Sequence, residues 1–341
     1  MIRYGYSGPG FDAWRERLGG YDRAFLIELF RRMLRIRLIE EEIERRYHQD
    51  QMKTPIHLVI GQEATSVGCC AAMRVSDLVY SSHRTHGVYL AKGGDLKAML
   101  SEMHCRANGC AGSRGGSMHL IDFSVGMAGT SAIVAGSVPI ATGAALAAKV
   151  QGADRAIAVF FGEAATEEGV VSECLNFAAL KQLPIVFFCE NNFYSVQSPL
   201  ATRQPERDLR RWAEGHAVNA VRVDGTNVLD VYEASKDALG RARAGAGPSF
   251  VEARVYRYRA HGGAGDDSKT GYRDVAEREA WEKLCPVEGL YGLLAGARLL
   301  DAADRRAMHD AIMRETLEAF EHALSSPDPV EADLYTHVYA D

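Results

Sequence analysis

The feature that most constrains the fold is a pair of apolar segments separated by one stretch of helical composition. Residues 156–162 read AIAVFFG and residues 184–190 read PIVFFCE. Both segments are short, almost entirely apolar and rich in β-branched or aromatic residues, which is typical of strands buried on both faces. Residues 166–182, between them, have the composition of a helix. Two buried strands joined by a helix predict a βαβ unit with a parallel sheet.

The flanking sequence extends this unit in both directions. Further strands are expected at 78–80, 218–223 and 249–255, and further helices at 21–50, from about 62, at 143–150, at 228–244 and within 275–325. Residues 105–136 contain too much glycine for a helix or a strand and predict a long loop of the kind that often serves a ligand. We therefore predict an α/β fold with a doubly wound, mostly parallel sheet and helical extensions at both ends.

Three segments follow from this pattern. Residues 1–50 form an N-terminal lead-in and a long helix, residues 51–273 form the α/β domain, and residues 274–341 form a C-terminal helical extension. A chain of 341 residues has room for about two domains or one large one.

Composition excludes several classes of protein. The net charge of −6 and the pI near 6.0 argue against nucleic-acid binding. The apolar stretches break well before the roughly 20 residues that a membrane helix needs. The N-terminus lacks an apolar signal core, so we expect a cytoplasmic protein. The seven cysteines include no CxxC pair, which gives no support to a disulfide scaffold or a structural zinc site.

Polar side chains follow the two central strands at the point where each strand ends. Glu163 comes directly after the first strand and Asn192 follows the second. Ligands of parallel sheets bind at the carboxyl edge of the strands, and a carboxylate with an amide carbonyl suits Mg²⁺ bound together with a phosphate. The helix expected from Thr166 would direct its N-terminus to the same place. The alternative, that Glu163 caps a helix and the asparagines form a turn, stays open from local sequence alone.

Histidines form a second group of candidates. His83 and Arg84 follow the strand at 78–80, His57 precedes the GQEA segment, and His261 lies in a polar loop. Arg84 suits bidentate pairing with a phosphate, and the alternative is a surface salt bridge. No two histidines stand at a ligand-like spacing with a third ligand close by, so a zinc centre is not expected. No GxGxxG motif follows a strand, which disfavours a dinucleotide site.

Taken in order, the motifs of the chain resemble one known family. The chain is similar to the alpha subunit of the thiamine-diphosphate-dependent first component of 2-oxo acid dehydrogenases, of the pyruvate, acetoin or branched-chain type. The resemblance runs from about residue 20 to the end. The motifs that carry it are HLVIGQEA (57–64), SSHRTHGVYLAKG (81–93), GSRGGSMHL (112–120), IVAGSVP (133–139), FFGEAATEEG (160–169), LNFAALKQLPIVFFCENNFYS (175–195), RVDG (222–225) and YRYRAHGGAGDDSKTGYR (256–273).

This resemblance implies thiamine diphosphate and Mg²⁺ as cofactors. It assigns the metal to the Glu163 carboxylate, the Asn192 side chain and the Tyr194 carbonyl. It also makes Arg84 a ligand of the diphosphate, and His261 and His57 the catalytic histidines, both of them in contact with the cofactor. The other cofactor-binding positions that it implies are His83, Ala132, Val134, Gly162, Ala164 and Ala165.

The chain departs from the family pattern at several of these positions. The family's metal motif begins Gly-Asp-Gly, whereas this chain has Gly162, Glu163 and Ala164. His83 stands where many members have tyrosine, and in this respect the chain resembles acetoin-type members. Gly262 stands where a serine usually follows the catalytic histidine. Of these departures, Ala164 is expected to narrow the approach of the backbone to the diphosphate.

The resemblance also implies a reaction and partners. The protein would decarboxylate a 2-oxo acid, or act on an acetoin-like substrate, and pass the acyl group to a lipoyl-bearing acyltransferase. The glutamate that sets the cofactor's tautomer would come from a separate beta subunit, because single-chain relatives are much longer. A heterotetramer of two alpha and two beta chains is therefore implied. Two alternatives remain: a carboligase or transketolase-like subunit without a lipoyl partner, and a non-catalytic degenerate homologue.

Overall fold

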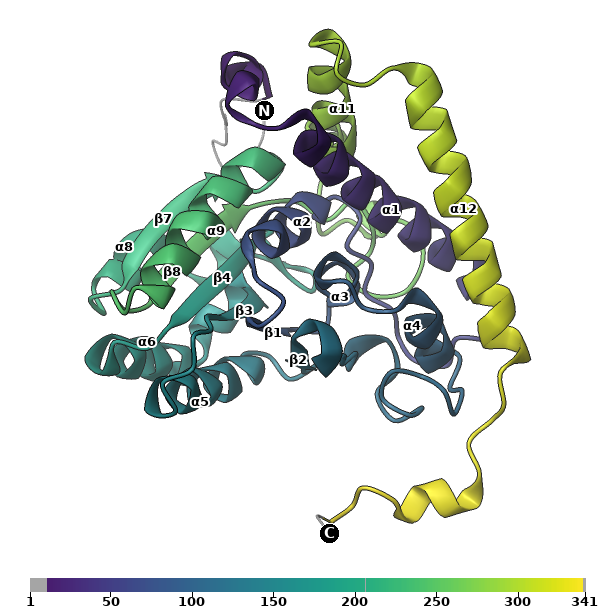
Figure 1. The fold of residues 1–341 in the computed structure, drawn as a ribbon, viewed down its shortest axis with the longest axis horizontal. Coiled ribbons are helices and arrows are strands. Elements are labelled where there is room, and N and C mark those ends of the chain that lie inside the picture. Colours follow the sequence, from purple (N-terminus) through teal and green to yellow (C-terminus); the bar gives the residue numbers. More distant parts are fainter. Residues whose placement is uncertain (1–10, 206, 340–341) are drawn as a thin grey trace.

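A six-stranded parallel sheet forms the centre of the computed structural model, which describes residues 11–205 and 207–339 (Figure 1). The strand order is β2–β1–β3–β4–β8–β7, and every neighbouring pair is parallel. The predicted parallel α/β fold is confirmed. The strands of this sheet are β1 (Leu78–Ser81), β2 (Met127–Thr130), β3 (Ile157–Gly162), β4 (Ile185–Asn191), β7 (Asn219–Asp224) and β8 (Ser249–Arg254).

Helices cover both faces of this sheet, which explains why the central strands are apolar throughout. Along β3, Ala158 and Phe160 join the buried cluster that includes α2 and α9, whereas Val159 and Phe161 join the cluster that includes α5 and α6. The helices of the first face are α2 (Glu63–Ala72) and α9 (Val228–Arg243), and those of the second face are α5 (Ser137–Val150), α6 (Gly169–Lys181) and α8 (Leu209–Glu214).

Long helices from the two ends of the chain lie side by side outside the sheet (Figure 1). The first of them, α1 (Arg23–Tyr47), begins where the Asp22 carboxylate accepts hydrogen bonds from the Ala24 and Phe25 amides. Helix α1 packs against α11 (Pro286–Gly296) and α12 (Ala302–Ser325). The helical extensions at both ends are therefore present, while the division of the chain at residues 50 and 273 stays a prediction.

Short elements complete the described chain. The remaining α-helices are α3 (His86–Lys92), α4 (Leu96–Met103), α7 (Leu200–Arg203) and α10 (Val275–Glu282). A small antiparallel pair consists of β5 (Tyr194–Ser195) and β6 (Ser198–Pro199). The 3₁₀ helices are η1 (Phe11–Gly20), η2 (Gly116–Met118), η3 (Phe123–Val125), η4 (Glu163–Glu167), η5 (Ser268–Thr270) and η6 (Glu331–Tyr335).

Two expectations about local structure are wrong. The glycine-rich segment 105–136 contains the edge strand β2, because pairing with β1 outweighs the low strand propensity of its residues. The helix expected from Thr166 starts later: a 3₁₀ turn comes first, extended backbone at Glu168 interrupts it, and α6 begins at Gly169. Within the described ranges, the helices are all too short or too polar to span a bilayer.

Candidate active site

The candidate site lies where the direction of the strand order reverses. From β1 the chain moves outward to β2, whereas from β3 it moves to β4 on the opposite side. Neighbouring strands whose connections run in opposite directions leave a crevice at their carboxyl ends, which is where ligands bind in open α/β sheets. His83 and Arg84 follow β1, and Glu163 follows β3. The topology alone therefore brings these two segments to one crevice.

A cavity of about 180 Å³ occupies this crevice. Each of the twelve residues proposed from the sequence as cofactor or metal ligands lines it: His57, His83, Arg84, Ala132, Val134, Gly162, Glu163, Ala164, Ala165, Asn192, Tyr194 and His261. The lining also includes residues that sequence reasoning missed, namely Ser82, Met118, Ile133, Ala135, Phe161, Ser195 and Val196. The cavity is smaller than the roughly 300–1,000 Å³ of typical ligand pockets, so the crevice has the size of one part of a larger site.

Glu163 and Asn192 share one wall because their strands are neighbours. Gly162 pairs with Glu190 across β3 and β4, which brings the residues that follow each strand to the same level. Glu163 is 1% exposed and Asn192 is 9% exposed. The Asn192 side-chain oxygen accepts a hydrogen bond from the Tyr194 amide at 3.2 Å. The structure therefore brings together the carboxylate and the amide that the sequence suggested as metal ligands.

The backbone after β4 is strained. Phe193 has a φ of 66° and Val196 a φ of 53°, in the left-handed region that side chains rarely adopt. Such a conformation is least favourable for a β-branched residue such as Val196, and it persists only where the surrounding structure enforces it. Strained residues cluster at binding sites, and Val196 lines the cavity. No sequence signal marked this turn beyond the asparagine pair.

Arg203 of α7 pairs with the Glu163 carboxylate inside this wall. The same guanidinium also pairs with Glu167. Burial raises the pKa of Glu163, and the positive charge of Arg203 opposes that rise. This ion pair indicates that the surroundings of the buried Glu163 carboxylate stabilise a positive charge beside it. Sequence reasoning missed Arg203, since it lies 40 residues after Glu163 and in no recognisable motif.

Arg84 is buried rather than on the surface, at 6% exposure. Its guanidinium donates to the Leu58 carbonyl at 2.5 Å and to the His261 carbonyl at 3.0 Å. It forms no ion pair with any residue in the described part of the chain, so the surface salt bridge considered from the sequence is absent there. Burial, with the nearby Arg257 guanidinium, lowers the pKa of Arg84 to about 9, and it remains charged at neutral pH.

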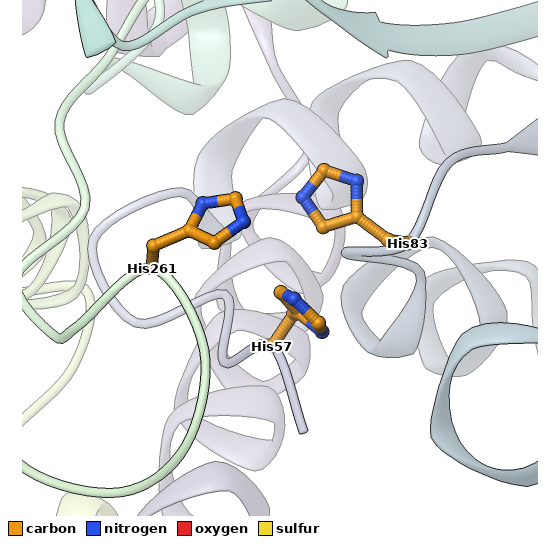
Figure 2. Close-up of side chains that lie close together, drawn as sticks. All are labelled: His57, His83 and His261. Carbon is orange, nitrogen blue, oxygen red and sulfur yellow. The ribbon is translucent and has the colours of Figure 1, made fainter. Parts of the chain in front are cut away.

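Three histidines from distant segments, all of which line the cavity, converge on one another (Figure 2). The ring centroids of His57 and His83 are 4.7 Å apart, those of His57 and His261 are 5.1 Å apart, and those of His83 and His261 are 5.4 Å apart. One nitrogen from each ring lies within 4.8 Å of the other two. The spacing of the histidines along the sequence, which gave no reason to expect a zinc centre, does not reveal this cluster.

All three imidazoles are neutral at physiological pH. Burial, together with the nearby Arg84 charge, lowers the pKa of His57 to about 3, that of His83 to about 2 and that of His261 to about 4. The Nδ1 atom of His57 is buried without a hydrogen-bond partner among the described residues. A neutral imidazole in this place can accept a proton or donate a hydrogen bond to a ligand in the cavity.

His86, the second histidine of the HRTHG segment, has a different role. Its side chain is fully buried, with Nδ1 2.6 Å from Glu40 and Nε2 2.8 Å from the Ser117 hydroxyl. Glu40 also accepts a hydrogen bond from the Val59 amide. This chain of contacts ties α1 to the segments that carry His57 and the glycine-rich loop, and it positions the cavity wall.

The donor set of the cavity fits a dication with a phosphate. The Glu163 carboxylate and the Asn192 amide are oxygen donors of the kind that Mg²⁺ prefers, and Arg84 is a phosphate-binding cation. The internal pairing of Glu163 with Arg203 independently shows that the carboxylate favours a cation beside it. The residues present therefore fit a metal and a diphosphate group.

Comparison with known proteins agrees with the family resemblance of the sequence motifs. The family model described as "Dehydrogenase E1 component" matches residues 31–331. The chain is 36% identical over 325 residues to the pyruvate dehydrogenase E1 component subunit alpha-3 of Arabidopsis thaliana chloroplasts, covering 92% of this chain and 74% of the relative. It is 35% identical over 316 residues to the alpha subunit of acetoin:2,6-dichlorophenolindophenol oxidoreductase of Bacillus subtilis, covering 91% and 92%. It is 32% identical over 313 residues to the pyruvate dehydrogenase E1 component subunit alpha of Rickettsia bellii, covering 92% and 95%.

Proposed function

The chain belongs to the dehydrogenase E1 component family, and on that premise we propose that it is the alpha subunit of a thiamine-diphosphate-dependent 2-oxo acid or acetoin dehydrogenase. The observation that carries this proposal is the convergence of Arg84, Glu163, Asn192 and three histidines on one cavity at the strand switch point. Alpha subunits of pyruvate and acetoin enzymes are among the relatives that share most of its length.

In the proposed site, the wall formed by Glu163 and Asn192 holds Mg²⁺ together with the diphosphate. Tyr194 adds its backbone carbonyl to the metal, and Arg84 pairs with the phosphate oxygens. The backbone around Ala132, Val134 and residues 162–165 lies against the rest of the cofactor. This assignment rests on the cavity lining and on the donor chemistry of these residues.

When bound, thiamine diphosphate would supply the nucleophilic carbon and the electron sink that decarboxylation of a 2-oxo acid requires. The protein has to orient the substrate, exclude water and move protons. His57 and His261 are neutral at the working pH, so each can accept a proton or donate a hydrogen bond to the carbonyl oxygen. Arg84, hydrogen-bonded to the His261 carbonyl, fixes the segment that carries that histidine.

A beta subunit completes the proposed site. The cavity is small, and its apolar rim is uncovered: Ile133 is 74% exposed, Val134 54% and Val196 50%. Exposed apolar side chains around a polar cavity are typical of a surface that a partner covers. The glutamate that sets the cofactor's tautomer is then supplied by that partner, in an assembly of two alpha and two beta chains. The acyl acceptor is a lipoyl-bearing acyltransferase.

The first experiment weighs the intact complex. The chain is purified gently from its own host and analysed by native mass spectrometry. We expect two copies of this chain with two partner chains of similar size, thiamine diphosphate and Mg²⁺. A dimer of this chain alone that takes up no cofactor on addition would contradict the catalytic proposal and favour a degenerate homologue.

A second experiment identifies the substrate and the acceptor. The purified complex is offered pyruvate, branched-chain 2-oxo acids and acetoin, with an artificial electron acceptor, a lipoyl domain or an aldehyde. Turnover of one 2-oxo acid or acetoin with acylation of the lipoyl domain is expected. Carbon–carbon bond formation with the aldehyde alone would support the carboligase alternative. The cytoplasmic location stays a prediction from the sequence, and cell fractionation would test it.

A further inference from the structure

We propose that His57, His83 and His261 form a binding site for a transition-metal dication of the zinc class. The three rings point toward one another from segments far apart in the chain (Figure 2). His57 precedes α2, His83 follows β1 and His261 follows β8. One nitrogen of each ring lies within 4.8 Å of the others, and all three residues line the cavity that Glu163 also lines.

The donor chemistry separates this site from the proposed magnesium site. Imidazole nitrogen suits Zn²⁺, Co²⁺, Ni²⁺ and Cu²⁺, whereas Mg²⁺ prefers oxygen. Three nitrogens bound to zinc at about 2.0–2.1 Å lie roughly 3.3 Å from one another, so the rings have to turn inward by about an ångström. His83 and His261 lie on loops and are only partly buried, which allows that movement.

The nitrogens are also free of competing contacts. None of the three rings hydrogen-bonds to another residue in the described part of the chain, and the buried His57 Nδ1 is an unpartnered polar atom. A buried polar atom without a partner is unusual and calls for a ligand, an ion or water. Gly262 leaves room beside the other nitrogen of this ring, since a Cβ there would lie 3.1 Å from the His57 Nε2 atom.

Nearby charged side chains limit the affinity of the three-histidine site for a metal dication. Arg84 and Arg257 act on all three histidines as positive charges and oppose a bound dication. Asp267, whose carboxylate accepts a hydrogen bond from the His261 amide at 3.1 Å, partly offsets them. We therefore expect weaker binding than at a structural zinc site, with a fourth coordination position open to the cavity. Only the functional consequence rests on the proposed function: the bound metal would occupy the substrate's place and inhibit turnover.

The test uses the full chain without a histidine tag, with its partner if they copurify, freed of metal and held in excess Mg²⁺. Co²⁺ is titrated in, and visible d–d absorption is recorded because nitrogen-rich, low-coordinate Co²⁺ absorbs far more strongly than octahedral Co²⁺ on oxygen. The variants are His83→Gln and His261→Gln. The control is His309→Gln, an exposed histidine of α12 remote from the cavity.

We expect one strongly absorbing Co²⁺ per chain, displaced by Zn²⁺ and unaffected by added Mg²⁺. Each site variant is expected to weaken binding at least about tenfold, since even changes around the ligands cost 10–100-fold, and His309→Gln is expected to bind normally. Absence of the strong bands, their loss on adding Mg²⁺, or their retention in both site variants would overturn the proposal. Near-UV circular dichroism of each metal-free variant shows whether it is folded. If a variant does not fold, the Zn²⁺ and Mg²⁺ competitions with the unchanged chain still test the proposal. Loss of Co²⁺ binding with intact thiamine diphosphate binding would leave the proposed function standing.

Discussion

The guanidinium of Arg203 pairs with the buried carboxylate of Glu163, at the position proposed to hold Mg²⁺. Glu163 is 1% exposed, so it needs either a cation or a proton at neutral pH. The Arg203 guanidinium provides that cation. A metal that binds Glu163 then competes with Arg203 for this carboxylate. Arg203 can keep its ion pair with Glu167, which is more exposed, when the metal is bound.

Replacing Arg203 with glutamine separates these two roles. The metal-free chain is expected to lose about 1–3 kcal/mol of unfolding free energy, because a buried carboxylate loses its partner. The rise in melting temperature on adding Mg²⁺ and thiamine diphosphate is expected to be larger than in the unchanged chain. Thermal unfolding with and without the ligands measures both effects. Arg210→Gln, which removes an exposed pair with Glu214, is the control. A smaller rise in Arg203→Gln would mean that Arg203 binds the cofactor instead.

Glu163 and its neighbour Glu167 offer a matched pair of variants. Both pair with Arg203, but only Glu163 lines the cavity. Glu163→Gln removes a charged oxygen ligand and is expected to weaken Mg²⁺-dependent thiamine diphosphate binding at least about tenfold, or 1.4 kcal/mol. Glu167→Gln is expected to bind normally. Isothermal titration of the assembled complex compares them, and equal losses in both variants would place the metal elsewhere.

The fold was largely predictable because its central strands are unusually apolar. The expected segments 156–162 and 184–190 correspond to β3 and β4 within one residue at each end. Burial on both faces leaves such a signature in the sequence. Strand β2 was missed because it lies at the sheet edge and contains glycine, so that its pairing with β1 depends on tertiary structure.

Contacts between distant segments account for what the sequence did not reveal about the site. Motif spacing pointed to Glu163 and Asn192, since each lies just beyond a recognisable strand. Arg203 lies in a four-residue helix without a motif, and its ion pair depends on the fold. The three histidines lie at positions 57, 83 and 261, and spacing rules for metal ligands detect local pairs only. The folded chain, rather than spacing along the sequence, brings the three rings together.

The histidine cluster predicts acid sensitivity. The pKa values of His57, His83 and His261 are lowered on folding to about 3, 2 and 4, from 6.5. Below about pH 6.5 the unfolded chain therefore binds protons that the folded chain does not, so stability falls as the pH falls toward 4 and is independent of these groups above 6.5. At about pH 5, the shift of His83 alone costs up to roughly 2 kcal/mol, and because the His57 and His261 charges contribute to that shift, the costs of the three rings do not simply add.

Urea unfolding at about pH 7.5 and about pH 5, with a chelator present, measures this effect. His83→Gln is expected to reduce the loss of unfolding free energy between the two pH values by up to about 2 kcal/mol. The exposed His309→Gln leaves the loss unchanged. If His83→Gln and the unchanged chain lose stability equally, the folded pKa of His83 is not depressed.

The apolar rim of the cavity predicts where the beta subunit binds. Ile133 is 74% exposed beside the cavity, and Val75, in the loop before β1, is 73% exposed far from the carboxyl edge. Ile133→Glu would place a charge in the interface, where desolvation without a partner is unfavourable, and is expected to weaken assembly at least about tenfold, or 1.4 kcal/mol. Val75→Glu adds the same charge to an equally exposed aliphatic position and is expected to leave assembly intact. Native mass spectrometry of coexpressed chains over a dilution series gives the fraction assembled. Equal assembly of the two variants would show that the partner leaves this rim uncovered, whereas equal loss would show that added charge alone disrupts the complex.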